Sequence, residues 1–423
     1  MSQAAIYYST SRNPINYAKN WEYSLNSTAA LITKYIGKNK NVVVPRKIEG
    51  KPVIVQNNVN NTSGVFANNQ NITSVKFGEG VRIANNNMSN MFCNCINITN
   101  IANIPNNTEN MANTFSLCSN LVNVSNIPAN VQNIVYLFNG CLKLSNFPEL
   151  PLNITNMAGV FYNCRNLVAS PAIPSNVTSM YNTFYNCTNL TQSPNIPNSV
   201  TNMSSTFFNC YNLTQVSNIS NSVTNMSSTF YGCYNLTQPP VIPNGVTNMV
   251  STFQGWNSLT QAPNIPNSVT NMDSTFRGCY KLTQAPNIPN KVSRIANTFR
   301  NCVNLTGNIF IESNRINNIS MANCFNGTSL EKNVYVPNVG YNATVNTWNA
   351  AFNATYGING KNGVTVYDIN TYSNSDVVVN EADWEFTTND TCTLITKYVG
   401  TNTEVVVPAV MNGKPVVLAE TTA

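Results

Sequence analysis

The chain has 423 residues, of which 42% are hydrophobic and only 9% are charged. It can bury a core, but amide and hydroxyl groups rather than ions must hydrate its surface. The net charge of +6 is too thin over this length for a nucleic-acid-binding surface. The absence of histidine removes the commonest general base and a common metal ligand, which weighs against an enzyme.

Residues 1–20 are expected to form an N-terminal arm. They contain no charged segment followed by an apolar run, so they do not resemble a secretory signal. The chain has no run of about 18 apolar residues, so we expect no membrane insertion. A chain with these properties is expected to leave its cell by another route, to belong to a particle, or to stay inside.

Residues 21–58 are expected to form a small β module. Their apolar runs LITKY, VVVP and GKPVI are separated by turns that contain glycine or asparagine. Short apolar runs bounded by such turn residues are typical of β-strands.

From residue 59 to 335 the apolar residues recur with a period of 23 residues. Each unit has a phenylalanine, a cysteine three residues later, a leucine three residues further on, and a methionine or isoleucine four residues before the phenylalanine. The phenylalanines are Phe92, Phe115, Phe138, Phe161, Phe184, Phe207, Phe230, Phe253, Phe276 and Phe299. A fixed period in the twenties predicts a solenoid, because each unit is too small to bury its apolar face alone.

Within a unit, the i, i+4, i+7 spacing of Met-x-x-x-Phe-x-x-Cys predicts a short helical turn with its apolar face inward. The segment from the leucine to an Ile-Pro pair predicts an extended piece. It contains a recurring Thr-Gln pair, as at Thr191-Gln192 and Thr214-Gln215. Glutamines in register favour a hydrogen-bonded amide ladder, although they could also face a ligand.

The cysteine position favours a structural role. One unit has Trp256 in its place, and a single column of thiols offers neither the matched pairs of disulfides nor the convergent ligands of a metal site. Cys93 and Cys95 could chelate or bridge, but no histidine or second pair supports this. We therefore predict buried thiols, no catalytic residue, no metal and no cofactor.

Units such as CYKLTQAPNIPNKVSRIANTF (Cys279 to Phe299) resemble the BspA-type, or Treponema pallidum-type, leucine-rich repeat in length and in the core Phe-x-x-Cys-x-x-Leu. The resemblance covers about residues 60–335. The proline lies seven residues after the leucine rather than six, so the turn there could differ. The resemblance implies a curved, open solenoid that binds other surfaces, as in bacterial adhesins, protist surface proteins and some phage-borne proteins. It carries over no catalytic residue.

Two variable positions supply candidate contact residues, namely the residue after the repeat phenylalanine and the residue after the cysteine. If both are exposed, the aromatic rings form a stripe suited to sugars or to a protein partner. The alternative is that the rings pack along the solenoid and stiffen it. The candidates are Tyr162, Tyr185, Phe208, Tyr231, Arg277 and Arg300 at the first position and Tyr211, Tyr234 and Tyr280 at the second.

Beyond the repeats, residues 336–383 predict a capping helix, at 342–357, and a connector. Residues 384–423 predict a second β module, because 384–418 repeat 21–55 at an offset of 363 residues. The second copy either caps the chain or docks head to tail on the first module of another copy of the chain. The two modules have opposite net charge, so such contacts between 21–55 and 384–418 could build a homo-oligomeric ring or fibre.

The sequence thus predicts a leucine-rich-repeat solenoid of parallel β-strands with short helices or turns, flanked by two small related β modules. The expected function is non-enzymatic recognition of a cell-surface protein or glycan, outside the cell or on a virion. A phage or phage-like particle component, such as a tail fibre or receptor-binding protein, is favoured over a bacterial or protist adhesin. A glycan hydrolase is the third alternative, and it lacks paired carboxylates because the repeats have few and scattered acidic residues.

Overall fold

The structure, a computed structural model, describes residues 6–8, 14–16, 19–57, 64–145, 147–313, 321–328, 332–336, 364–369, 384–388, 393–398, 410–411 and 414–418. The chain divides into two units, residues 1–366 and 367–423. The described residues contain no α-helix, and hence none that could span a membrane; a short 3₁₀ turn, η2, spans Ala84–Asn86.

The predicted N-terminal β module is present. Its apolar runs supply the buried side chains of Ile32, Val53 and Val55. β3 and β4 are antiparallel, β7 runs parallel to β4, and β6 and β9 pair with β7. A separate hairpin, β1 with β2, precedes them. These strands are β1 (Ile6–Tyr8), β2 (Pro14–Asn16), β3 (Trp21–Leu25), β4 (Ala30–Tyr35), β6 (Lys47–Ile48), β7 (Lys51–Val55) and β9 (Arg82–Ile83).

The module is continuous with the solenoid. β5 (Asn41–Val44) starts a parallel sheet that continues through β8 (Ser74–Phe77), β10 (Asn100–Ala102) and β11 (Asn123–Val124). The rings of Trp21 and Tyr35 each lie 5.8 Å from the ring of Phe66. The module therefore closes the N-terminal end of the solenoid core.

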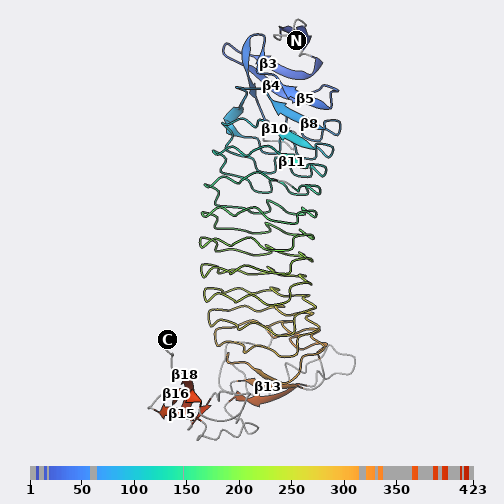
Figure 1. Ribbon diagram of the computed structural model, residues 1–423. Helices are drawn as coiled ribbons and strands as arrows, with labels where there is room; N and C mark the ends of the chain where they lie inside the picture. Colours follow the sequence, from blue (N-terminus) through green and yellow to red (C-terminus); the bar gives the residue numbers. More distant parts are fainter. Residues whose placement is uncertain are drawn as a thin grey trace. The chain divides into compact units, whose positions relative to one another are not determined.

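The predicted 23-residue units form successive coils of a β-solenoid (Figure 1). Neighbouring coils are joined by parallel backbone bridges, for example between Asn202 and Asn225 and between Asn225 and Asn248. The backbone N–H of Phe115 also donates to the carbonyl oxygen of Leu137 in the next coil, at 3.0 Å. Each coil thus satisfies its backbone on its neighbours, as stacked repeats require.

The helical turn predicted for Met-x-x-x-Phe-x-x-Cys is wrong. The chain instead makes tight turns, in which the N–H of Thr206 bonds to the carbonyl of Met203 and that of Cys210 to Phe207. The residues two before each phenylalanine and one before each cysteine have positive φ, as at Ser205 (+52°) and Asn209 (+55°). A left-handed residue interrupts a right-handed helix, and Asn and Gly adopt it at lowest cost.

The predicted extended segments form few regular strands in the solenoid. Beyond β11, the Thr-Gln segment forms isolated parallel bridges, such as Gln192 with Gln215. The predicted glutamine amide ladder is not formed among the described residues. The hydroxyl of Thr214 instead donates to the carbonyl of Thr191, at 3.1 Å. Side-chain amides bond between coils at other positions, as from Asn186 to Asn163, at 2.8 Å.

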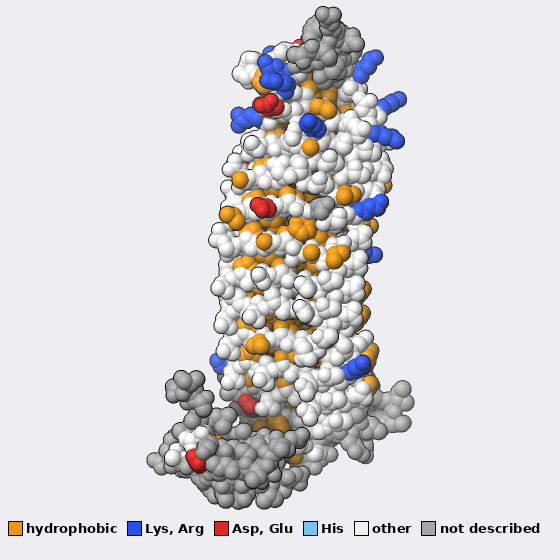
Figure 2. Space-filling view, in the orientation of Figure 1, with side chains coloured by type: hydrophobic (Ala, Val, Ile, Leu, Met, Phe, Trp, Pro, Cys, Tyr) orange, Lys and Arg blue, Asp and Glu red, His pale blue; other side chains and the backbone are white. Residues whose placement is uncertain are grey.

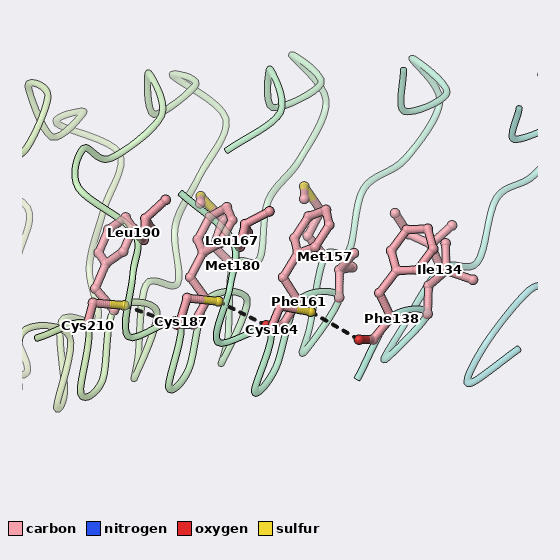
Figure 3. Packing of buried hydrophobic residues seen from close by; sticks show 14 of the residues in the cluster. Ile134, Phe138, Met157, Phe161, Cys164, Leu167, Met180, Cys187, Leu190 and Cys210 are labelled. Carbon is pink, nitrogen blue, oxygen red and sulfur yellow. Dashed lines mark hydrogen bonds between the residues drawn. The ribbon is translucent and has the colours of Figure 1, made fainter. Parts of the chain in front are cut away.

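The repeat phenylalanines form one buried column of stacked rings. Ring centroids of neighbouring coils lie 5.5 Å apart at Phe161 and Phe184 and 5.7 Å apart at Phe184 and Phe207. The column also includes Phe66 and Phe325, which stack on Phe92 and Phe299 outside the strict period. The methionine, cysteine and leucine positions surround it (Figure 3).

The C-terminal strands reproduce the pairing of the first module. β15 pairs antiparallel with β16, with Trp384 opposite Tyr398 where the first module has Trp21 opposite Tyr35. β18 runs parallel to β16 and antiparallel to β17. The remaining strands are β12 (Asn308–Phe310), β13 (Lys332–Val336), β14 (Val364–Asp368), β15 (Trp384–Thr388), β16 (Thr393–Tyr398), β17 (Val410–Met411) and β18 (Lys414–Leu418). The capping helix predicted at 342–357 lies outside the described residues.

Candidate recognition surface

Four candidate residues form an aromatic column on the solenoid surface: Tyr162, Tyr185, Phe208 and Tyr231. Their ring centroids are 4.5, 4.4 and 4.2 Å apart in successive coils, with planes within 8° of parallel. Each side chain is half-buried. Because each inner ring has both faces covered by its neighbours, a partner can reach only ring edges and hydroxyl groups.

Tyr136 extends this column, although sequence analysis missed it. Its ring meets Tyr162 edge-on, with centroids 6.1 Å apart. Its backbone has a φ of +54°, at a position that other coils fill with Asn, Ser or Gly. A side chain at Gly159 in the next coil would overlap this ring, since a Cβ there would lie 2.1 Å from it. The signal available in the sequence was a tyrosine two residues before the repeat phenylalanine, followed 23 residues later by a glycine.

A second, more exposed pair lies at the position after the cysteine. Tyr211 and Tyr234 have exposed fractions of 37% and 41%, and their rings stack 5.2 Å apart and nearly parallel. Tyr280, also exposed, occupies the same position two coils further on, with Asn257 between them. The structure therefore brings two of the three candidates at this position together.

The phenol groups of the two sets influence one another. Burial is the main cause that raises the pKa of Tyr185, and the nearby phenols of Tyr162, Tyr231 and Tyr211 add to it. Burial likewise raises the pKa of Tyr234, with smaller contributions that include Tyr211 and Tyr231. The hydroxyls of Tyr185 and Tyr234 therefore keep their protons at neutral pH and can both donate and accept hydrogen bonds. We call Tyr162, Tyr185, Phe208, Tyr231, Tyr211 and Tyr234 the aromatic surface.

The two candidate arginines do not join the aromatic rings. Arg277 and Arg300 continue the same position of the coil, but Gln254 separates them from Tyr231. Both are half-buried, and Arg300 Nη1 lies 3.4 Å from the Asn297 amide oxygen. They mark the point at which the column changes from aromatic to cationic.

Five of the six residues of the aromatic surface lie in a segment without charge, and Tyr162 precedes that segment. Residues 166–272 contain no Asp, Glu, Lys, Arg or His, and we call them the neutral segment. Figure 2 shows a middle section of the solenoid whose surface consists almost entirely of uncharged polar and hydrophobic side chains. A partner that docks on this segment is recognised by shape, apolar contact and neutral hydrogen bonds.

The cysteines of the repeat column have a structural role. Nine column thiols are fully buried and donate to a phenylalanine carbonyl of the preceding coil, as Cys187 does to Phe161 at 3.0 Å. Burial raises the pKa of Cys95 to about 12, and the pKa of each other column thiol is also raised by burial. In the described part of the chain, Cys93 and Cys95 are free thiols and no cluster of three His, Cys, Asp or Glu side chains could hold a metal.

A polar hollow of about 550 Å³ lies beside two of the recurring glutamines, Gln261 and Gln284. Glu312 lines it, and burial raises the pKa of that carboxyl group. Glu312 is the one acidic residue among the described residues of the hollow. A glycosidase site needs two carboxyl groups at a defined separation, and the hollow lacks the second.

Comparison with known proteins places these features in context. The family described as "BspA type Leucine rich repeat region" matches in six copies, within residues 52–168, 135–260 and 226–349. A search of the curated proteins gave no match.

Solved structures with this fold include two bacterial leucine-rich proteins. A leucine rich cell surface protein from Faecalibacterium prausnitzii A2-165 is 20% identical, with 84% of this chain and 100% of that chain covered and a TM-score of 0.50. A leucine-rich repeat protein from Bacteroides ovatus ATCC 8483 is 19% identical, with 82% and 98% covered and a TM-score of 0.51. The leucine rich repeat protein of T. pallidum is 26% identical, with 46% and 89% covered and a TM-score of 0.38.

Proposed function

We propose a non-enzymatic recognition role for this chain, which belongs to the BspA-type leucine-rich repeat family. Its partner is a protein or glycan on a cell surface, and the aromatic surface makes the contact. The observation that carries this proposal is the position of six aromatic rings on one part of the solenoid, five of them in the neutral segment.

The two parts of the aromatic surface have different roles. The column from Tyr162 to Tyr231 is preorganised by stacking, so it presents a rigid wall of ring edges and hydroxyls. Tyr211 and Tyr234 project further, and large aromatic side chains of this kind are the commonest energetic centres of interfaces. A sugar ring or an apolar protein side chain fits against them, and neighbouring hydroxyls supply hydrogen bonds.

The test is binding of fluorescently labelled protein to whole cells of a panel of low-GC bacteria, with free glycans as competitors. The decisive variant is Tyr211→Ser with Tyr234→Ser. Its matched control is Leu142→Ser with Val303→Ser, which removes two exposed apolar side chains, 40% and 48% exposed, from the same coil position elsewhere. We expect the tyrosine variant to lose at least tenfold in affinity and the control variant to bind normally.

The two versions of this role, an envelope adhesin and a phage or phage-like particle component, use the same surface. The F. prausnitzii neighbour is described as a cell surface protein, which favours the envelope version. Fractionation of the producing cells separates them, because an adhesin remains with the envelope while a virion protein sediments with particles. Recovery only in assembled particles, without binding to any cell, would contradict a recognition role.

A further inference from the structure

A second surface, at the N-terminal end of the solenoid, carries many charged side chains, whereas the neutral segment carries none. We call it the basic collar, and its exposed side chains are Lys34, Lys38, Lys40, Arg46, Lys47, Lys76 and Arg82. Three exposed acidic residues, Glu22, Glu49 and Glu79, accompany them. Figure 2 shows the blue side chains gathered at this end of the solenoid.

The basic side chains of the collar are not neutralised by ion pairs. Among the residues that the structure describes, the ion pair formed is that of Arg294 with Asp273, far along the solenoid from the collar. Lys34 lies opposite Glu22 in the register of β3 and β4, yet the two side chains are not paired. Unpaired cations grouped in this way repel one another, and an anionic ligand would relieve that repulsion.

The collar extends over both sheets of the N-terminal end. Lys76 lies on β8 and faces outward beside the exposed side chain of Val43 on β5. Arg82 lies on β9, which pairs with β7 in the other sheet. These side chains therefore project from two sheets rather than from one. A flexible polymer can wrap around them, whereas a flat lipid bilayer meets only a part of the set.

We propose that the basic collar binds a flexible anionic polymer, as opposed to a stiff nucleic-acid duplex, that bears phosphate or sulfate groups. Lysine dominates the collar, and its ammonium group contacts such groups as a point charge without demanding a fixed geometry. Polymer binding at the collar can be distinguished from partner binding at the aromatic surface by its salt dependence. Binding at the collar releases counterions, so its affinity falls steeply with salt. A chain with both sites holds a charged polymer at one end and presents a neutral surface further along the solenoid.

The test measures binding of the full chain to polyphosphate and dextran sulfate, with uncharged dextran as the negative control, between 20 and 300 mM salt. The variant Lys40→Gln/Arg46→Gln/Lys47→Gln/Lys76→Gln removes four collar charges. Its matched control, Lys143→Gln/Arg165→Gln/Lys281→Gln/Lys291→Gln, removes four exposed charges elsewhere. Urea unfolding of both variants verifies that the solenoid is intact.

We expect the wild type and the control variant to bind both polyanions, and the collar variant to lose roughly tenfold or more at low salt. Equal losses in the two variants would overturn the proposal, because the effect would then follow net charge alone. Binding to anionic vesicles or duplex DNA but not to polyphosphate or dextran sulfate would overturn it as well. Self-association that the collar variant abolishes without polymer would assign the collar to a second copy of this chain. The Tyr211→Ser/Tyr234→Ser variant should bind polyanions normally, so failure here and failure of the recognition role are distinguishable.

Discussion

The thiol of Cys164 donates to the carbonyl oxygen of Phe138, 26 residues earlier, across a distance of 3.1 Å (Figure 3). The same carbonyl accepts the backbone N–H of Cys141 in its own coil. Because this pattern recurs along the stack, the cysteine column joins coils through hydrogen bonds as well as by apolar packing. The thiol is therefore a small buried donor, and its chemistry is suppressed by burial.

Alkaline pH is expected to destabilise the solenoid through these thiols. Their pKa is raised by burial above the ordinary value of 9.0, to about 12 at Cys95 and Cys302. The unfolded chain therefore loses thiol protons above pH 9 that the folded chain retains. The stabilisation is complete below pH 9 and is lost as pH rises towards 12, by about 1.4 kcal/mol per thiol and pH unit. Urea midpoints at pH 7, 9 and 10 measure this, and equal midpoints at all three would contradict it.

Seven of the ten repeat phenylalanines follow a buried threonine that donates a hydrogen bond. Thr206 Oγ1 lies 2.8 Å from the carbonyl of Met180 and 2.7 Å from that of Met203, and the residue is fully buried. We expect Thr206→Val to cost about 1–2 kcal/mol in free energy of unfolding, because the hydroxyl donor shared by two buried carbonyls is lost. Thr201→Val is the control, since Thr201 is exposed, and it should change the free energy by less than about 0.5 kcal/mol.

Leu117 is strained, and its replacement should stabilise the protein. It has a φ of +62° at a position where the other coils have Asn or Gly, and its side chain is 48% exposed. We expect Leu117→Asn to raise the free energy of unfolding by about 0.5–1 kcal/mol, since asparagine tolerates the left-handed conformation better. Gly140→Ala, at the same position one coil later, should have the opposite effect, and thermal denaturation of both variants checks the pair.

Trp256 shows how one coil tolerates a different residue at the cysteine position. Its Nε1 donates to the Leu236 carbonyl oxygen and also lies 2.8 Å from Ser258 Oγ. Most other coils have asparagine at the position of Ser258. We expect Trp256→Cys to destabilise the protein by about 3 kcal/mol, because the smaller residue leaves a cavity. Trp256→Phe, which keeps most of the volume but loses the donor, should cost less. Urea denaturation measures both, and a neutral Trp256→Cys would contradict the adaptation of this coil.

The core could be predicted from the sequence because apolar side chains at fixed spacing have few alternatives to stacking. The phenylalanine, cysteine and leucine positions and the repeated β module are where the spacing placed them. The turn conformation could not be predicted in this way, since i, i+4, i+7 spacing suits a helix as well as a pair of tight turns. Residues with a left-handed backbone, such as Asn209, exclude the helix and favour the tight turns. Asparagine is so common in this chain that its recurrence at these positions did not reveal the turns in advance.

The aromatic surface could be predicted only in part. The spacing placed Tyr185 beside Phe208, but it did not reveal that stacking covers the ring faces, because exposure depends on the direction of each side chain. Tyr136 was missed because it occupies a turn position rather than the variable one. The buried threonines were missed because a hydroxyl residue at a fixed position resembles a surface residue.

The most direct measurement is cell binding by three proteins: the wild type, Tyr185→Ala, and Tyr211→Ser/Tyr234→Ser. Tyr185 lies between two rings at 4.5 and 4.4 Å, so its loss should lower the free energy of unfolding by about 1–2 kcal/mol. The double variant should unfold like the wild type but bind at least tenfold more weakly. Full binding by the folded double variant would contradict the recognition surface assigned here.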